Sequence, residues 1–186
     1  AFLDAGFQAV PAMRRKTFDL GERTVLIPVE RVGALRAAAI IMPVLVLLGG
    51  LGGSQGYWHN ALHFGGHAAA ALLIAILAGA VLTPLLLPWL PGRAFSLKGL
   101  TVGLVAAFLF SWWRGLELSF WSSRLDALAW LLLIPAVAAF LAMNFTGAST
   151  YTSLSGVKRE MRWAIPLQIG TVVMGLGLWL TSRFLA

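Results

Sequence analysis

Three histidines follow one another at four-residue intervals, as His59, His63 and His67 in "WHNALHFGGH". Residues at this spacing share one face of a continuous helix, and imidazoles placed so can bind a metal ion or a haem. However, Gly65-Gly66 separate His63 from His67, and no carboxylate lies close to them in the sequence. Because glycine weakens a helix, we expect an interruption before His67. The three histidines are therefore weak metal candidates, with a position at the membrane surface as the simpler explanation.

A second polar cluster lies in "MNFTGASTYTSLSGVKREMR", from Met143 to Arg162, where seven of the thirteen residues from Asn144 to Gly156 carry a hydroxyl group. Hydroxyls can satisfy non-helical backbone at or below the headgroup level. Two interpretations are open: a solvated polar loop, or a surface that docks a cytoplasmic domain carrying an anionic or amide-rich cofactor. Ser155 would be the N-cap of a short helix. The residues of this candidate docking segment are Asn144, Thr146, Ser149, Thr150, Tyr151, Thr152, Ser155, Lys158, Arg159 and Arg162.

The elements that position these residues are expected to be membrane helices. Only 11% of the residues are charged and 59% are hydrophobic, whereas a soluble domain carries about 25% charged residues. Five apolar runs are long enough to cross a hydrocarbon layer of about 30 Å. We therefore expect an all-α membrane protein, with five transmembrane helices and a short cytoplasmic N-terminal arm. The spans are expected at about 32–53, 67–90, 97–116, 125–143 and 163–181.

The distribution of Lys and Arg predicts the orientation. Eleven of them lie in the arm and in the second and fourth connections, against three on the opposite side, namely Arg114, Arg124 and Arg183. This bias predicts a plasma (inner) membrane protein with its N-terminus in the cytoplasm and its C-terminus outside. It also accounts for the net charge of +7. Since the cations are not interleaved with a stacking platform, the lipid bilayer is expected as partner and nucleic acid is not.

Small residues and tryptophans predict how the helices pack and sit. Two stripes at four-residue spacing, which would let helix backbones approach closely in lipid, are Gly99-Gly103-Ala107-Ser111 and Ala71-Ala75-Gly79. The tryptophans lie near the ends of spans, as interfacial anchors do. Those expected at the outer ends are Trp58, Trp112, Trp113, Trp121, Trp130 and Trp179, with Trp89 and Trp163 at the inner ends.

Several chemistries have no residues to support them. The chain has no cysteine, which excludes disulfides, thiolate metal sites and cysteine nucleophiles within it. No paired carboxylates, nucleophile–base pair or phosphate-binding glycine loop is present in the sequence. Glu117 lies between Arg114 and Arg124, and local pairing accounts for it. No span carries an acidic residue at mid-depth, which is unusual for an ion-coupled transporter.

Residues 1–31 differ from the rest of the chain. "AFLDAGF" is typical of a helix end with a glycine stop, and "RRKTFDLGERTVLIPVE" predicts two short strands around a turn at Leu20-Gly21-Glu22. About thirty residues cannot bury a core of their own. The chain begins at Ala1 rather than Met, so we expect the tail of a longer protein's soluble domain, or a short cytoplasmic arm.

The segment "MNFTGASTYTSLSGVKREM", followed by a span that contains Pro166, resembles the membrane domain of the mercury-methylation corrinoid proteins. These are relatives of the corrinoid subunits of CO dehydrogenase/acetyl-CoA synthase. "AFLDAGFQAVPAMRRKTFDLGERTVLIPVE" resembles the end of that family's corrinoid-binding domain and its linker. The resemblance covers essentially the whole chain, as the C-terminal half of the family architecture. It implies that residues 1–31 end the corrinoid-binding domain and that residues 32–186 form the transmembrane domain.

The resemblance implies a methyltransferase in which cobalamin, held by the soluble domain, passes a methyl group to Hg(II). A ferredoxin-like iron–sulfur protein would supply the reducing electrons. In the family, a cysteine in an Asn-Val-Trp-Cys-Ala-Ala-Gly-Lys helix is the lower cobalt ligand, and this chain contains neither that motif nor any cysteine. No catalytic or cofactor-binding residue is therefore assigned here. The expected role of the chain is to anchor its own corrinoid-binding domain and to position the ferredoxin-like partner.

Three alternatives remain open. The first is a membrane-tethered corrinoid protein of one-carbon or acetyl-CoA metabolism. The second is a small transporter that uses the hydroxyl-rich segment as a re-entrant loop. The third is a metal-binding membrane protein built on His59, His63 and His67. A cysteine-bearing cap helix upstream of Ala1 would favour the corrinoid proteins, whereas an initiator Met directly before it would favour the transporter.

Overall fold

The chain forms a bundle of helices. The computed structural model describes residues 20–53, 55–115, 118–148 and 154–185, and these contain no β-strand. Within them, five helical rods are long and apolar enough to cross a membrane. The elements are α1 (Leu20–Gly49), α2 (Tyr57–Asn60), the π-helical η2 (Ala61–Gly65), α3 (Gly66–Ile76), the π-helical η3 (Leu77–Leu82), α4 (Thr83–Leu86), α5 (Phe95–Trp113), α6 (Trp121–Ala148) and α7 (Leu154–Phe184). The second rod consists of α2 to α4.

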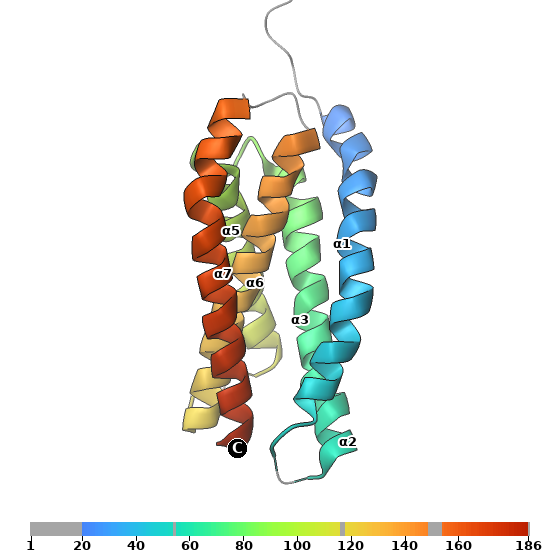
Figure 1. Ribbon diagram of the computed structural model, residues 1–186, viewed down its shortest axis with the longest axis vertical. Coiled ribbons are helices and arrows are strands. Elements are labelled where there is room, and N and C mark those ends of the chain that lie inside the picture. The colour runs from blue at the N-terminus through green and yellow to red at the C-terminus, as the bar shows by residue number, and fades with distance from the viewer. Residues whose placement is uncertain (1–19, 54, 116–117, 149–153, 186) are drawn as a thin grey trace, which may run out of the picture.

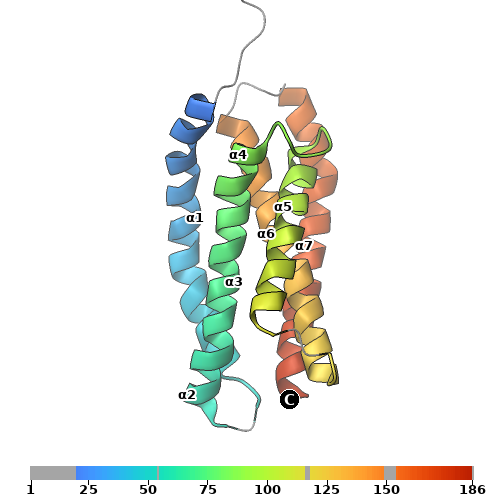
Figure 2. The ribbon, with the colours of Figure 1, turned by 180° about the vertical axis from the view of Figure 1, so that it is seen from behind.

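The rods run alternately in opposite directions, so their ends gather in two groups (Figure 1). α1 begins at the end of the bundle where α6 stops and α7 starts, and Figure 2 shows the connection from α4 to α5 at that end too. We call it the arm end. The opposite end, which we call the far end, holds the connections from α1 to α2 and from α5 to α6, together with the end of α7.

The all-α membrane fold expected from the sequence is confirmed, with corrected boundaries. The apolar spans are Val32–Gly49, Tyr57–Leu86, Phe95–Trp113, Trp121–Asn144 and Val157–Phe184. The largest correction is the second span, which starts at Tyr57 rather than at His67. Large apolar side chains such as Ile40 and Leu62 are exposed on the outside of the rods. Apolar surface of this extent, on helices long enough to cross a bilayer, is typical of contact with lipid.

The glycine pair Gly65-Gly66 does not interrupt the second rod, contrary to the sequence-based expectation. Both residues have right-handed helical backbone angles, and η2 continues directly into α3. Gly65 is needed for a close approach instead, because a Cβ on it would lie 2.5 Å from the Cα of Val46 in α1. Gly66 has open space around such a Cβ. In lipid, contact between backbones replaces the apolar attraction that holds helices together in water.

The predicted small-residue stripes pack against α6, which touches every other rod. A Cβ on Gly79 would lie 2.6 Å from the carbonyl oxygen of Ala138, and one on Gly99 would lie 2.7 Å from the same oxygen. A Cβ on Gly103 would lie 2.6 Å from the Cα of Pro135. The stripes therefore seat η3 and α5 directly on the backbone of α6, as predicted.

Two of the tryptophans predicted as interfacial anchors belong to the core. Trp130 of α6 and Trp179 of α7 are 3% and 1% exposed, and their rings pack edge to face with centroids 5.8 Å apart. The other six are exposed, among them Trp112 and Trp121 at the far end and Trp89 at the arm end. Sequence position near a span end fits both roles, and only the direction in which the side chain faces separates them.

Helix replaces two features expected at the arm end. Residues 24–30 belong to α1 and form no strand, because a helix pairs its own backbone groups whereas a strand needs a partner. α6 continues to Ala148 and α7 starts at Leu154, so most of the hydroxyl-rich segment is helical. Ser155 consequently lies inside α7 and is not its N-cap. Residues 1–19, with the predicted helix end and first strand, and residues 149–153 lie outside the described residues.

Candidate functional site

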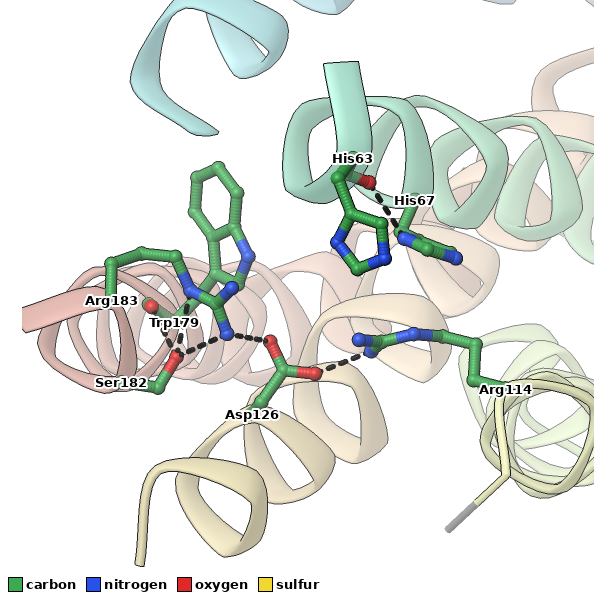
Figure 3. Close-up of polar contacts among 7 residues, drawn as sticks. All are labelled: His63, His67, Arg114, Asp126, Trp179, Ser182 and Arg183. Atoms are coloured by element: carbon green, nitrogen blue, oxygen red, sulfur yellow. Dashed lines mark hydrogen bonds and ion pairs between the residues drawn. The ribbon is translucent and has the colours of Figure 1, made fainter. Parts of the chain in front are cut away.

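A buried carboxylate with two guanidinium groups lies at the far end. Asp126, in the second turn of α6, receives hydrogen bonds from Arg114 Nη1 and Arg183 Nη2. The Arg183 contact measures 2.8 Å, and the side chains of Asp126, Arg183 and Arg114 are 8%, 4% and 19% exposed. Figure 3 shows the two arginines reaching the carboxylate from opposite sides. We call these three residues the Asp126 triad.

The topology explains why the triad forms. Arg114 directly follows α5, Asp126 lies near the start of α6 and Arg183 lies in the last turn of α7. In an alternating bundle these three positions meet at one end. Transfer of a charge from water to a protein interior requires a counter-charge and hydrogen bonds to offset the lost hydration. The triad supplies both for Asp126, because each carboxylate oxygen accepts one guanidinium hydrogen bond.

Arg183 is held on several sides. Its Nε and Nη2 donate to Ser182 Oγ over 3.2 and 3.0 Å, and Ser182 in turn donates to the carbonyl oxygen of Trp179 over 2.6 Å. The face of its guanidinium stacks on Phe64, with the central carbon 3.8 Å from the ring centroid. Such stacking is attractive for a guanidinium withdrawn from water. The position of this side chain is therefore set by α7, α6 and η2 together.

The connection from α1 to α2 closes the same end. Gly53 N donates a hydrogen bond to the Arg183 carbonyl oxygen over 3.0 Å, and the buried Asn60 donates from Nδ2 to the Gly52 carbonyl over 2.7 Å. Gly52 has φ of +73°, and a Cβ there would lie 2.5 Å from the Arg183 carbonyl oxygen. Only glycine fits both that backbone angle and that space. The far end is therefore tightly constructed.

The three histidines are neighbours on the second rod, at the side of the triad. Ring centroids of His59 and His63 are 6.2 Å apart, and those of His63 and His67 are 4.8 Å apart. His67 Nδ1 donates to the His63 carbonyl oxygen over 2.6 Å, so that nitrogen is not free to bind a metal. Among the described residues, no group of three or more His, Cys, Asp and Glu side chains could hold a metal ion. Because the rod continues through Gly65-Gly66, the spacing brings all three imidazoles together, whereas an interruption before His67 was expected.

A polar cavity of about 330 Å³ opens beside the triad. His63, Phe64 and the hydroxyl residues Ser111, Ser122 and Ser123 line it together with all three members of the triad. Arg114 and Arg183 each contribute a positive charge to its lining and Asp126 contributes one negative charge, so the sum of these three charges is positive. Sequence reasoning placed Arg114 and Arg183 in the outer charge count, and it missed Asp126. The sequence did contain a signal for it. Asp126 lies at the start of the fourth span, and Arg114 and Arg183 lie at the ends of the third and fifth spans, so all three are expected at the same end of the bundle.

The candidate docking segment lies at the opposite end of the bundle. Lys158, Arg159 and Arg162 are exposed on the first turns of α7, and Asn144 is exposed on α6. Thr146 and Ser155 are in helices whose side chains there are not described, and Ser149, Thr150, Tyr151 and Thr152 lie outside the described residues. The structure thus gathers the described cations of the segment on one helix, without showing the hydroxyl groups around them.

Glu160, among these cations, makes a contact that the sequence analysis did not anticipate. Its Oε1 accepts a hydrogen bond over 2.6 Å from the backbone N–H of Ser96, in the first turn of α5. The first N–H groups of a helix have no partner within it, and a carboxylate there is also favoured by the helix dipole. Glu160 therefore ties the start of α7 to the start of α5 and orients the exposed cations beside it.

No known protein family, no curated protein and no solved structure matches this chain. The functional argument therefore depends on the residues and their arrangement. The fold and these two ends define the class: a helical domain of the membrane-spanning kind, with exposed cations at one end and a buried charge cluster at the other.

Proposed function

We propose that this chain is the membrane domain of a corrinoid-dependent methyltransferase similar to the mercury-methylation proteins. The observation that supports it best is the position of two segments that carry the resemblance. α1, which follows the N-terminal arm, starts at the end of the bundle where α6 ends and α7 begins, and these two helix ends carry the described part of the hydroxyl-rich segment (Figure 1). A soluble domain that precedes the arm would therefore lie beside that segment.

The proposed role of the chain is to anchor and to position. With the arm end in the cytoplasm, as the Lys and Arg distribution predicts, the exposed Lys158, Arg159 and Arg162 face the compartment of the corrinoid-binding domain and of a ferredoxin-like reductant. Tethering raises the effective concentration of each partner for the other, and correct positioning lowers the entropic barrier of a transfer reaction. Methyl transfer from cobalamin to Hg(II) would take place in the preceding domain.

This assignment gives the chain no catalytic residue. The family's cobalt ligand is a cysteine thiolate, and the chain has no cysteine, so the cobalamin would be held by the corrinoid-binding domain. Asn144, Lys158, Arg159 and Arg162 would contact that domain or the reductant through hydrogen bonds and charge, with Glu160 holding the helix that presents the cations. Whether the methyl acceptor is Hg(II) or a one-carbon acceptor is decided by the other domain.

A photo-crosslinking amino acid placed in the full-length protein tests the docking directly. Substituted at Arg159, it should cross-link to the corrinoid-binding domain or to the ferredoxin-like partner, as identified by mass spectrometry of the joined peptides. The matched control is Arg124, an exposed arginine of the far end. Cross-links from position 124 to those partners, or none from position 159, would contradict the proposal.

Activity provides the second test. The combined change Lys158→Gln, Arg159→Gln and Arg162→Gln should lower the rate of methylmercury formation by the full-length protein, roughly tenfold if two exposed charge contacts of about 0.7 kcal/mol each are lost. Arg124→Gln should leave the rate unchanged. An unchanged rate in the triple variant, with correct membrane insertion, would exclude docking through these cations.

A further inference from the structure

The Asp126 triad has more positive charge than its carboxylate can neutralise. Arg114 and Arg183 together carry two positive charges, and Asp126 carries one negative charge. No other carboxylate among the described residues lines the cavity beside them. An uncompensated charge withdrawn from water is expensive, so a second anion would be bound strongly here. The imidazole of His63 adds a further possible donor to the same wall.

One nitrogen of Arg183 has no hydrogen-bond acceptor among the residues that the structure describes. Arg183 is 4% exposed, and its Nη1 is buried without a hydrogen-bond acceptor in the described part of the chain, whereas Nε and Nη2 both donate. The stacking on Phe64 does not use this nitrogen's hydrogens, because stacking engages the face of a guanidinium and hydrogen bonds leave in its plane. Arg183 is one of the residues that line the cavity, and its Nη1 is a donor without an acceptor among the described residues.

The depth of the cavity indicates where the acceptor would come from. Exposed tryptophans at the far end include Trp58, Trp112, Trp113 and Trp121, and such side chains mark the headgroup level of a bilayer. The cavity lies at this end too, lined by residues of η2, of the end of α5, of the start of α6 and of the end of α7. A group at this level meets both dissolved anions and the phosphates of lipid headgroups.

We propose that the far-end cavity is a binding site for a phosphate group, held by Arg114 and Arg183 with help from His63 and the lining serines. Guanidinium groups match the oxygens of phosphate through paired hydrogen bonds, and a volume of about 330 Å³ accommodates a phosphate with a small substituent. The phosphate belongs either to a free ion or to a lipid headgroup. This site is independent of the proposed docking function, which uses the opposite end of the bundle.

The test uses the purified protein in a phosphate-free glycoside detergent. In the first arm, inorganic phosphate is titrated calorimetrically. In the second, the protein is placed in nanodiscs of phosphatidylglycerol or of a phosphate-free galactolipid, and retained lipid is measured by native mass spectrometry after release. Binding in the first arm assigns the site to a free ion, and selective retention of phosphatidylglycerol assigns it to a headgroup. No binding in either arm overturns the proposal.

Variants locate the binding. Arg114→Gln should weaken it at least about tenfold, the effect of losing one charge-assisted hydrogen bond. Asp126→Leu with Arg183→Met replaces the buried ion pair by apolar side chains of similar size, which proteins often tolerate, and should abolish binding while thermal unfolding stays cooperative. Arg124→Gln, with an exposed arginine that stacks on Trp121 outside the cavity, should bind as the parent does. Undiminished binding in the first two variants would overturn the assignment.

Discussion

The arm end and the far end of this bundle use arginine in opposite ways. At the arm end, Arg159 and Arg162 are exposed on α7, where water hydrates them. At the far end, Arg183 lies buried against Asp126, Ser182 and Phe64. The exposed arginines can orient the helix in the membrane or contact a partner without destabilising the fold. The buried group is part of the framework, because its charge must be matched by neighbours. Counting cations along the sequence treats both groups alike.

Of the substitutions that test this difference between the two ends, one at Asp126 is expected to lower stability most. Asp126→Ala leaves the buried Arg183 without its counter-ion, and losing one member of a buried pair lowers the free energy of unfolding by about 3–5 kcal/mol. Thermal or denaturant unfolding in detergent, followed by circular dichroism, measures this loss. Asp126→Leu combined with Arg183→Met should recover most of it. Equal stability of the single variant and the parent would show that the triad is not part of the framework.

A smaller effect is expected for Glu160, the one carboxylate at the arm end with a described helix-capping bond. Glu160→Ala removes the acceptor of the Ser96 N–H, and loss of an N-terminal capping interaction lowers the free energy of unfolding by about 0.5–2 kcal/mol. The control is Glu160→Gln, whose amide oxygen can still accept this hydrogen bond. The same unfolding measurement distinguishes them. If both variants lose equal stability, the charge matters and the hydrogen bond does not.

The smallest effect on stability is expected for the exposed cations. Lys158→Gln, Arg159→Gln and Arg162→Gln together should change the free energy of unfolding of the isolated domain by no more than about 0.5 kcal/mol for each substitution. The physical reason is that these side chains are hydrated before and after unfolding. A loss as large as that of Asp126→Ala would remove the distinction between the two ends.

Some features of this protein depend on the local sequence alone, and others depend on contacts between helices. Five apolar runs, the alternation of span directions and the small-residue stripes all follow from composition and spacing, because length and hydrophobicity determine which segments cross a bilayer. Residues that usually disfavour a helix were less reliable guides to where helices end. Gly65-Gly66 continue a helix, and residues 24–30 are helical despite their β-branched side chains. A helix pairs most of its backbone groups within its own segment, whereas a strand needs a partner strand.

The sequence by itself determined that this protein is an all-α membrane domain and that its cations divide unequally between two ends. Tertiary structure alone decided that Trp130 and Trp179 are core residues and that Asp126 is the centre of a charge cluster. The physical reason is that the three members of the triad are separated by 12 and 57 residues. Local periodicity describes which face a side chain takes on its own helix. It does not describe which charges from other helices come to that face.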